Sequence, residues 1–362
     1  MRTRVTIVYN EPLHSRYDTV GEDKAVLGVL EAVEAVHGAL LELGHSVVRV
    51  PVAPPIERAG RELRTLRADL VFNLFEGFCG YPETEDVVPE VISKTGIPFT
   101  GCPAAALRLS LDKANVKVML KAAGIRTPDF QLLNPETLHR FRLGYPCMVK
   151  PRGEDASHGL SPESIVSDFV ALEKQVRFVS NTYRGSVLVE KFVDGHEFNA
   201  TVLGKSEGVV LPPSEIVYSL PPGMPRILTF AAKWEPDSLY FQGTRVICPA
   251  SVGVEERQRI METAAAAFKL LGCAGYARVD MRMDEDGELS VIEVNPNPDI
   301  SPGAGAVLQA AAAGMSYTQF VEKIVQLALD SKSNENQYSP HGSRRQAQHN
   351  ENTAPYAGVQ TF

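Results

Sequence analysis

The sequence predicts an α/β protein, in part α+β, built from two or three packed units. The chain has 362 residues, of which 44% are hydrophobic, and a globular domain takes roughly 150 residues. Its first part alternates β-branched runs with a helical pattern, which is typical of a parallel sheet with crossover helices. Its later part contains short strands joined by turn-forming residues, which favours antiparallel pairing.

Four strands and one helix are predicted in the first unit of about a hundred residues. The strands are short apolar runs bounded by polar or turn-forming residues. The helix has apolar residues at helical spacing until Gly44 ends the pattern. The strands are expected at residues 4–9, 46–50, 69–74 and 96–101, and the helix at residues 26–43.

Beyond Ser110 the pattern changes to helices separated by short strands. Helices are expected at residues 111–124, 255–271 and 318–330, and strands at 147–150, 187–193, 197–204, 277–283 and 289–295. The last two strands are joined by Asp-Glu-Asp-Gly, a hairpin signal. The Pro- and Gly-rich segment 212–243 is expected to be loop, and the polar residues 331–362 a disordered tail.

Composition excludes several functional classes. The net charge of −8 argues against generic nucleic-acid binding, which needs an excess of Lys and Arg. Five isolated cysteines without CxxC spacing are typical of a reducing compartment. The first residues are too weakly apolar for a signal peptide, and no window approaches 18 apolar residues. We expect a cytoplasmic protein with no membrane or nucleic-acid partner.

The C-terminal hairpin carries the sharpest chemical signal. Asp280 lies on one strand, and Glu293 and Asn295 lie two residues apart on its partner, so their side chains can share one face. Mg²⁺ favours a few such oxygens completed by phosphate oxygens. The alternative is a solvated hairpin with ordinary outward polar residues. The interleaved apolar residues are expected to face the core: Val279, Met281, Ile292 and Val294.

Three lysines occupy positions from which they could reach a phosphate. Lys113 begins a helix, Lys150 ends an apolar strand, and Lys233 follows the Pro- and Gly-rich segment. A lysine at a strand end delivers a point charge to the next loop, here the small polar residues 153–159, which suit a lid over a triphosphate. The GxxxxGK[ST] motif of a P-loop is absent. Taken singly, each lysine is more typical of the surface.

Two glutamates flank a predicted strand junction. Glu190 ends one strand and Glu197 begins the next. A carboxylate can accept hydrogen bonds from an adenine amino group or from ribose hydroxyls, while the backbone from Lys191 to Val193 can contact the base edge. Taken alone, alternating charge is more typical of the solvated face of a strand.

Together these segments resemble the ATP-grasp superfamily and, within it, the D-alanine–D-alanine ligases. The similarity covers roughly residues 1–328. Five segments carry it in the family's order: LDKANVKVMLKAAGI, MVKPRGEDASHG, VLVEKFVDGHEFNATVLG, AKW and GYARVDMRMDEDGELSVIEVNPNPDIS. The resemblance implies an ATP-grasp fold with four parts. These are a Rossmann-like pre-ATP-grasp domain (1–105), a central lid subdomain (106–185), a C-terminal subdomain with an antiparallel sheet and a metal site (186–330), and the tail (331–362).

The resemblance also implies the roles of single residues. ATP is the expected cosubstrate, bound by Lys113, Lys150, Ser157, Glu190, Lys191, Val193, Glu197 and Lys233. Two Mg²⁺ ions, for which Mn²⁺ can substitute, are expected at Asp280, Glu293 and Asn295. Arg278 is the expected catalytic residue, which stabilises the oxyanion of a tetrahedral intermediate. Its alternative role is that of a structural partner for Asp280 or Glu293.

The implied reaction is an ADP-forming ligation. A substrate carboxylate attacks the γ-phosphate of ATP to give an acyl phosphate, and an amine then displaces phosphate. The expected partners are a small carboxylate and a small amine, such as amino acids or peptides, with the chain as a homodimer.

Several positions depart from the D-alanine–D-alanine ligases. In that family a lid serine and a tyrosine link to an N-terminal glutamate, and another serine holds the second amino acid. Here the first two fall on Ala156 and Trp234, and the last on Ala304. The family's His-Gly segment is replaced by Asn73-Leu74-Phe75-Glu76-Gly77. The N-terminal glutamate has three candidate counterparts: Glu11, Glu22 and Asp23.

Three functions remain open from the sequence. The first is a carboxylate–amine ligase whose substrates are not two D-alanines. The second is a true D-alanine–D-alanine or D-alanine–D-lactate ligase with remodelled contacts. The third is a non-catalytic, nucleotide-binding regulatory protein on the same scaffold.

Overall fold

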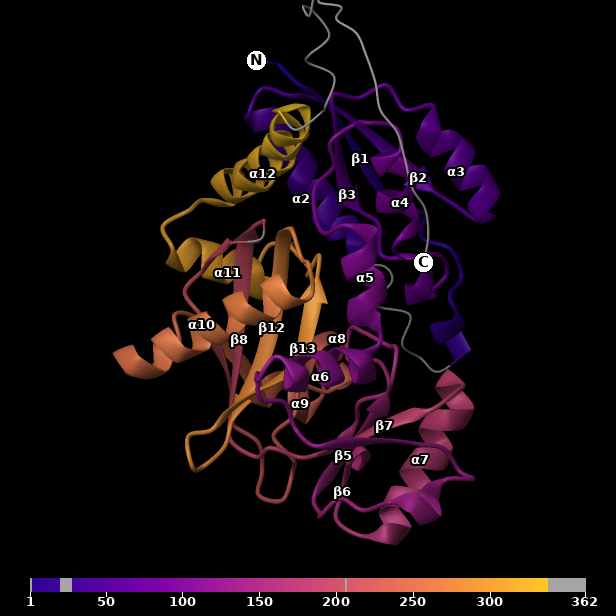
Figure 1. Cartoon of the computed structure of the whole chain (residues 1–362), viewed down its shortest axis with the longest axis vertical. Helices are drawn as coiled ribbons and strands as arrows, with labels where there is room; N and C mark the ends of the chain where they lie inside the picture. The colour runs from indigo at the N-terminus through magenta and orange to yellow at the C-terminus, as the bar shows by residue number, and fades with distance from the viewer. Residues whose placement is uncertain (1, 20–27, 206, 338–362) are drawn as a thin grey trace, which may run out of the picture.

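The computed structural model describes residues 2–19, 28–205 and 207–337, and of residues 331–337 only the backbone. Three sheets organise this part of the chain (Figure 1). The predicted start of the first helix, at residues 26–27, and most of the predicted tail, residues 338–362, lie outside the described residues. None of the helices in the described ranges is long and apolar enough to cross a membrane.

The first sheet is parallel, with the strand order β2-β1-β3, as the sequence predicted for this unit. One face packs against α2 and α12, and the other against α3 and α4. Helix α12 thus returns from the C-terminal end of the described chain to cover the first sheet (Figure 1). The elements are β1 (Arg4–Asn10), η1 (Arg16–Thr19), α2 (Val29–Glu42), β2 (Ser46–Val52), α3 (Ile56–Arg64), β3 (Leu70–Leu74), η2 (Pro82–Thr84), α4 (Val87–Ser93) and α5 (Ala104–Leu111).

The fourth strand predicted for this sheet, residues 96–101, is wrong. In the described structure only Phe99 forms an isolated bridge, to Val71 on β3. Pro98 has no N–H to donate to a neighbouring strand. The glycines at both ends of the segment adopt φ values of 72° and 90°, which turn the chain away from an extended path.

The second sheet is antiparallel, with the strand order β4-β7-β5-β6, and α7 packs against it. Helix α6 begins at Lys113 because the Asp112 side chain accepts a hydrogen bond from the backbone N–H of Asn115 at 3.2 Å. The strand predicted over residues 187–193 ends at Lys191. The elements are α6 (Lys113–Ala122), β4 (Phe130–Leu133), η3 (Leu138–Arg140), β5 (Cys147–Pro151), η4 (Pro162–Ser164), β6 (Ile165–Val166), α7 (Phe169–Tyr183) and β7 (Val187–Lys191).

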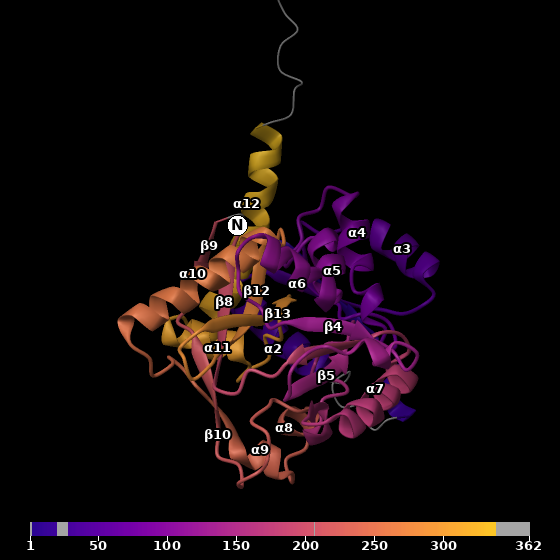
Figure 2. The same ribbon diagram turned by 60° about the horizontal axis from the view of Figure 1, so that its bottom comes forward.

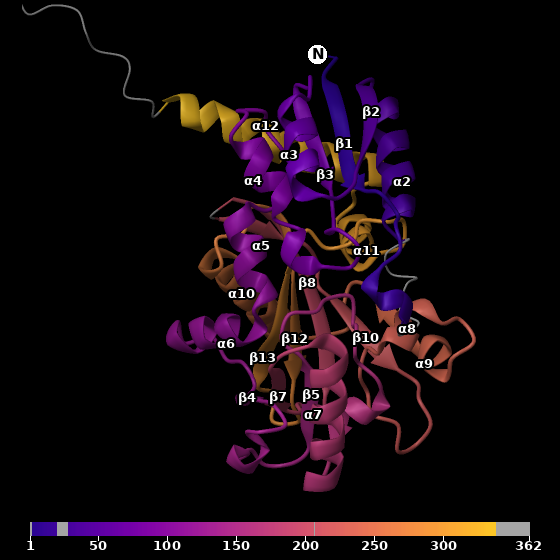
Figure 3. The same ribbon diagram turned by 90° about the vertical axis from the view of Figure 1, so that its right-hand side faces the viewer.

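The third sheet is also antiparallel, with the order β11-β10-β8-β12-β13 and with β9 paired to β8. Helix α10 covers its apolar face, and α5 and α6 pack at the same core near β13 (Figure 2). Figure 3 shows the first sheet above the other two, with α5 and α11 at the level between them. The elements are β8 (His196–Gly204), β9 (Gly208–Val210), β10 (Ser214–Tyr218), α8 (Phe230–Trp234), α9 (Leu239–Gly243), β11 (Thr244–Ile247), α10 (Val254–Leu270), β12 (Gly275–Met283), β13 (Leu289–Pro296), α11 (Gly305–Ala312) and α12 (Tyr317–Gln337).

Two sequence predictions for this region are wrong. Residues 212–243 are not simply loop, because they contain β10, α8 and α9. Strand β10 forms by pairing with β8, and the short helices begin at Thr229 and Ser238, whose side chains accept backbone N–H groups. Residues 331–337 are not a disordered tail, because α12 continues to Gln337. No Gly or Pro interrupts the helix there.

Gln309 of α11 joins the polar face of the third sheet to a helix. Its side chain is fully buried. The amide oxygen accepts the backbone N–H of Thr201 at 2.7 Å, and the amide nitrogen donates to the carbonyl of Asn199 at 3.0 Å and to Ser214 Oγ at 2.8 Å. One side chain therefore links α11 to both β8 and β10.

Replacing this amide with an apolar side chain should destabilise the fold. Gln309→Leu is expected to lower the free energy of unfolding by about 2–4 kcal/mol, because buried polar groups lose their partners at roughly 1–3 kcal/mol each. Urea unfolding followed by circular dichroism measures this change. The matched control is Gln258→Leu on the exposed side of α10, which should stay within about 0.5 kcal/mol of the parent. Equal losses in both variants would contradict the assigned role.

Candidate active site

The third sheet has one apolar face and one polar face, because successive side chains of a strand point to opposite sides. On β8 the buried Phe198 and Ala200 join the core under α10. The residues that alternate with them, Glu197 and Asn199, lie on the other face. Strand β12 follows the same rule, with Asp280 on the polar face. The polar side chains of neighbouring strands therefore collect on one side of the sheet.

Strand pairing places the predicted metal ligands side by side. Asp280 pairs with Glu293 on β13, and Arg278 pairs with Asn295. On its other side Asp280 pairs with Asn199 of β8. Two carboxylates, two amides and a guanidinium thus occupy adjacent positions on three strands.

A bulge in β13 produces this alignment and corrects the predicted position of Ile292. The pairing shifts after Asp280, so that Met281 pairs with Val291 and Ile292 has no partner on β12. Val291 is fully buried in the core instead, whereas Ile292 is half-buried and lines a small cavity. The extra residue brings Glu293 opposite Asp280; without it, Ile292 would take that place.

The Asp280 carboxylate accepts four hydrogen bonds from three side chains. Arg278 donates to it through Nε at 2.7 Å and through Nη2 at 2.8 Å, in a two-point pair. The side-chain amides of Asn199 and Asn295 donate to it at 2.7 and 2.8 Å. Burial opposes the charge of Arg278, but Asp280 and Glu293 outweigh it and raise its pKa above the ordinary value. Arg278 therefore makes the contact with Asp280 that is expected of a structural partner, the alternative role given to it from the sequence.

Three predicted lysines converge on Glu293. Lys113 Nζ lies 3.0 Å from Glu293 Oε1. The recessed position of Glu293 opposes ionisation, but the charges of Lys113, Lys150 and Lys233 lower its pKa to about 2. The loss of solvent around Lys233 and the positive charge of the nearby Arg278 lower the pKa of that lysine. The cluster thus has an excess of positive charge, which suits a polyanionic ligand.

Glu190 lies between two lysines in the interior. It is 2% exposed, and its two oxygens lie 2.7 Å from Lys150 Nζ and 2.7 Å from Lys117 Nζ. Burial opposes the charge of Glu190, but both ammonium groups lower its pKa. Burial lowers the pKa of Lys117 to about 8, aided by repulsion from Lys150. Sequence reasoning missed Lys117, although it follows Lys113 by four residues on the same helix face.

Glu197 is held by two residues that the sequence analysis did not single out. It accepts hydrogen bonds from Tyr218 at 2.8 Å and from Arg282 at 2.8 and 3.1 Å. Arg282 also donates to the carbonyl of Val193 at 2.7 Å, and the N–H of Lys191 donates to a backbone carbonyl before β4 at 2.8 Å. Arg282 lies two residues after Asp280 on β12, so the alternation of strand side chains puts both on one face. This spacing was visible in the sequence. Tyr218 lay in the segment expected to be loop.

The loop formed by residues 153–159, here called the lid, contacts the first unit. Tyr17 of η1 donates to the Glu154 carboxylate at 2.5 Å, and Arg16 donates to the same carboxylate. The ring of His158 stacks on Tyr17 with centroids 3.7 Å apart, and lies 5.4 Å from that of Phe230. The lid is thereby closed against η1 and α8.

Ser157 lies at the turn of the lid. It follows Ala156, and the two adopt φ values of 64° and 47°, a left-handed conformation that is uncommon for residues other than glycine. Lys113 donates from Nζ to the carbonyl of Glu154. The lysine cluster and the lid therefore meet at one place, with Ser157 three residues further along.

Comparison with known proteins agrees with this geometry. The family model described as the D-ala D-ala ligase C-terminus matches residues 119–326. A D-alanine–D-alanine ligase of Haemophilus influenzae is 31% identical over 307 residues, which cover 82% of this chain and 94% of that protein. A putative D-alanine–D-lactate ligase of Streptomyces coelicolor is 31% identical over 272 residues, 75% of each chain.

A solved structure shows the same fold. It is the crystal structure of a D-alanine–D-alanine ligase from Bacillus anthracis complexed with ATP. The alignment has a TM-score of 0.71 at 22% identity and covers 92% of this chain and 99% of that chain. The likeness confirms the ATP-grasp fold expected from the sequence.

Removing the charge of Glu190 should destabilise the protein strongly. Glu190→Gln is expected to lower the free energy of unfolding by about 3–5 kcal/mol at pH 7, because two buried ammonium groups lose their counter-charge. The stabilisation is present above about pH 4.3, the unfolded pKa, and is lost as the pH falls through the lowered folded pKa. The difference between variant and parent should therefore shrink in acid.

The matched control is Glu173→Gln. Glu173 forms an exposed i,i+4 pair with Arg177 and should change stability by no more than about 0.5 kcal/mol. Thermal and urea unfolding at pH 7 and pH 4 measure both variants. A loss for Glu190→Gln no larger than that of the control would contradict the buried-charge account.

Removing the Tyr17 ring should loosen the lid. Tyr17→Ala abolishes both the stack on His158 and the hydrogen bond to Glu154, whereas Tyr17→Phe abolishes only the hydrogen bond. Amide hydrogen exchange of residues 153–159, followed by mass spectrometry, should accelerate roughly tenfold or more in Tyr17→Ala and less in Tyr17→Phe. Tyr145→Ala, in which a tyrosine that packs on Phe141 is removed, should leave the lid unchanged. Unaltered exchange in Tyr17→Ala would show that other contacts hold the lid.

Proposed function

This chain belongs to the D-alanine–D-alanine ligase family of ATP-grasp enzymes, and we propose that it phosphorylates a substrate carboxylate with ATP and joins the product to an amine. It is an ATP-dependent ligase. The proposal concerns the residues that perform the reaction and the substrates that it joins. The observation that carries it is the convergence of Lys113, Lys150, Lys233 and Arg278 on the carboxylates of the third sheet.

The lysines and the hinge between β7 and β8 bind ATP in this proposal. Lys113, Lys150 and Lys233 neutralise the phosphates, and Ser157 on the lid covers them. Lysine is suited to this role because its ammonium is a compact point charge with three donors. The base and ribose occupy the hinge. There the nucleoside contacts the carboxylates of Glu190 and Glu197 and the backbone of Lys191 and Val193.

The same face of the sheet fits Mg²⁺. Asp280, Glu293 and the amide oxygen of Asn295 lie on adjacent strands and offer the hard oxygen ligands that Mg²⁺ prefers. When bound, Mg²⁺ would neutralise phosphate oxygens as a Lewis acid. In the described part of the chain no three His, Cys, Asp or Glu residues gather as a metal site.

Arg278 is the proposed oxyanion partner. Asp280 holds its guanidinium in a fixed two-point pair, so the remaining donors face a defined direction without reorganising during the reaction. The substrate carboxylate attacks the γ-phosphorus and releases ADP. The amine then adds to the acyl carbon, and Arg278 stabilises the tetrahedral oxyanion before phosphate leaves.

The substrates are proposed to differ from two D-alanines. Ala156, Trp234 and Ala304 lack the hydroxyl groups that the family's lid serine, tyrosine and carboxylate-binding serine supply. A zwitterionic substrate would leave charged groups without those partners, which is costly in a recessed site. The family relationship supports the general reaction, and these positions support another choice of substrate.

A second candidate is a true D-alanine–D-alanine or D-alanine–D-lactate ligase. It is favoured by the names of two relatives, each about 31% identical to this chain. Release of ADP on addition of D-alanine alone, with formation of the dipeptide, would favour it. A screen that offers amino acids singly and in pairs separates the two, because the leading proposal expects ADP release only with other pairs.

Removing the Asp280 charge should stop turnover. Asp280→Asn is expected to lower ADP release by at least roughly 100-fold, the scale for loss of one preorganised electrostatic group, and to raise the Mg²⁺ concentration needed for half-maximal rate. Lys233→Met should lower turnover similarly without changing the Mg²⁺ dependence. The matched control is Asp286→Asn at the exposed turn of the same hairpin, which should keep parent activity. Parent kinetics in Asp280→Asn, with folding verified by circular dichroism, would reject the metal assignment.

A further inference from the structure

Tyr17 of η1 is a buried tyrosine that none of the proposed reaction steps uses. Its side chain is 3% exposed, as is that of His158, and Glu154 is 6% exposed. Tyr17 contacts both of these lid residues, because it donates a hydrogen bond to Glu154 and stacks on His158. Glu154 lies near the start of the lid and His158 near its end. One residue of the first unit therefore holds the lid at two points.

The first unit fixes the position of Tyr17. The backbone N–H of Arg16 donates to the carbonyl of Cys79 at 3.2 Å, and that of Tyr17 donates to Ser15 Oγ at 3.0 Å. The ring of Tyr17 also packs closely on Gly80, where an added Cβ would lie 2.7 Å from two of the ring carbons. These contacts attach the ring to the first unit from both the backbone and the side-chain side.

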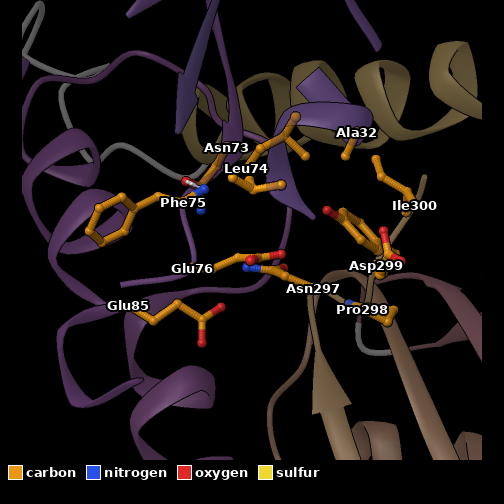
Figure 4. Close-up of a pocket in the computed structure, with 12 residues that line it drawn as sticks. Ala32, Asn73, Leu74, Phe75, Glu76, Glu85, Asn297, Pro298, Asp299 and Ile300 are labelled. Carbon is orange, nitrogen blue, oxygen red and sulfur yellow. Dashed lines mark hydrogen bonds between the residues drawn. The ribbon is translucent and has the colours of Figure 1, made fainter. Parts of the chain in front are cut away.

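The first unit is in turn fixed against the third sheet. The amide oxygen of Asn297, just beyond β13, accepts the N–H of Cys102 at 2.7 Å. The backbones approach so closely that a Cβ added at Gly275 of β12 would lie 2.8 Å from the carbonyl oxygen of Gly101. Figure 4 shows a small pocket at this junction, with Glu76 of the first unit and Asn297 among its lining residues. Tyr17 is therefore a fixed point for the lid relative to the third sheet.

One connection leads from Tyr17 through Glu154 to Lys113. The Glu154 carboxylate accepts from Tyr17 and Arg16, and the backbone carbonyl of the same residue accepts from Lys113 Nζ. Lys113 Nζ also lies 3.0 Å from Glu293 Oε1. An ammonium group has three donors, so these two acceptors set the direction of the third N–H. That direction depends on Glu154 and hence on its contacts with η1.

A second connection leads through His158 to Lys233. The ring of His158 lies between that of Tyr17, at 3.7 Å, and that of Phe230, at 5.4 Å between centroids. Phe230 begins α8, and its N–H donates to the carbonyl of Leu160 just after the lid at 3.1 Å. Lys233 follows Phe230 by three residues on the same short helix. The stack therefore helps to place the helix that carries this lysine.

We propose that Tyr17 is a positioning residue for ATP, which aligns Lys113 through Glu154 and Lys233 through His158. Tyr17 contacts neither the nucleotide nor the reacting atoms, and it acts only through the lid. This inference rests on the proposed function, in which both lysines bind the phosphates, and it adds the residue that places them.

Calorimetry with Mg²⁺ and adenylyl imidodiphosphate, a non-hydrolysable ATP analogue, tests the proposal on the full chain. Tyr17→Phe keeps the stack but lacks the donor to Glu154, and it should weaken binding by roughly tenfold, the scale of a hydrogen bond to a charged group. Tyr17→Ala loses both contacts and should weaken binding further. The control is Tyr145→Phe, the same change at a tyrosine that packs on Phe141, which should bind as the parent does. Parent affinity in both Tyr17 variants would overturn the proposal.

A double-mutant cycle distinguishes positioning from a general structural role. Added to Lys113→Met, the change Tyr17→Phe should weaken binding by less than about twofold, because the residue through which it acts is already gone. Added to Lys233→Met, it should keep its roughly tenfold effect. A general structural role would weaken binding equally in the parent and in both lysine variants, and that result would overturn the proposal.

The second connection has a cycle of its own. His158→Ala removes the stack on Tyr17 and should weaken binding of the analogue by roughly threefold, within the range measured for aromatic pairs. This effect should disappear in Lys233→Met and persist in Lys113→Met. An effect of the same size in both lysine variants would overturn the assignment of His158. Tyr17→Phe, which retains the packing on Gly80, keeps the first cycle decisive even if Tyr17→Ala fails to fold.

Failure of this inference can be told from failure of the proposed function. Parent affinity for the analogue in Lys113→Met and in Lys233→Met would reject the proposed role of both lysines, and this inference with it. Weakened binding in the lysine variants, together with parent binding in both Tyr17 variants, would reject the inference alone and leave the proposed function in place.

Discussion

The site brings several lysine ammonium groups close together away from bulk solvent. Such an arrangement is stable only if carboxylates lie between the ammonium groups. Glu190 separates Lys117 from Lys150, and Glu293 faces Lys113 with two further lysines within electrostatic reach. These charges come from α6, β5, β7, α8 and β13, so the compensation ties the second sheet to the third. A polyanion such as a triphosphate would add to this balance, because the lysines outnumber the carboxylates that they contact.

A single extra residue in β13 determines how the carboxylates are presented. Strand side chains alternate with a period of two, so Val291 and Glu293 would share one face of a regular strand. The bulge at Ile292 changes this relation: Val291 faces the core and Glu293 faces Asp280. Bulges often direct a side chain toward an active site. Asp280 in turn holds Arg278 in place, so the bulge brings Glu293 beside this charged pair.

The residues proposed to bind ATP and those proposed to bind the substrates differ in how closely they resemble the family. The lysines and hinge glutamates lie in segments that resemble the ATP-binding motifs of the family. The substrate side has different chemistry. Hydroxyl groups are absent at Ala156 and Ala304, the lid closes on η1 through Tyr17 and His158, and acidic side chains line the neighbouring pocket. In the proposed function, separate groups of residues therefore contact the cosubstrate and the substrates.

The sequence by itself determined the elements with strong local signals: the parallel first unit, the α6 helix, and the β12–β13 hairpin with its Asp-Gly turn. It also located the lysines and carboxylates, because the motifs that carry them are contiguous. Only the tertiary structure decided which charges meet. Lys117 reaches Glu190 across 73 residues of sequence, β10 exists because β8 pairs with it, and the bulge at Ile292 depends on the register with β12. Each of these is a contact between distant segments, and neither periodicity nor spacing along the chain encodes such contacts directly.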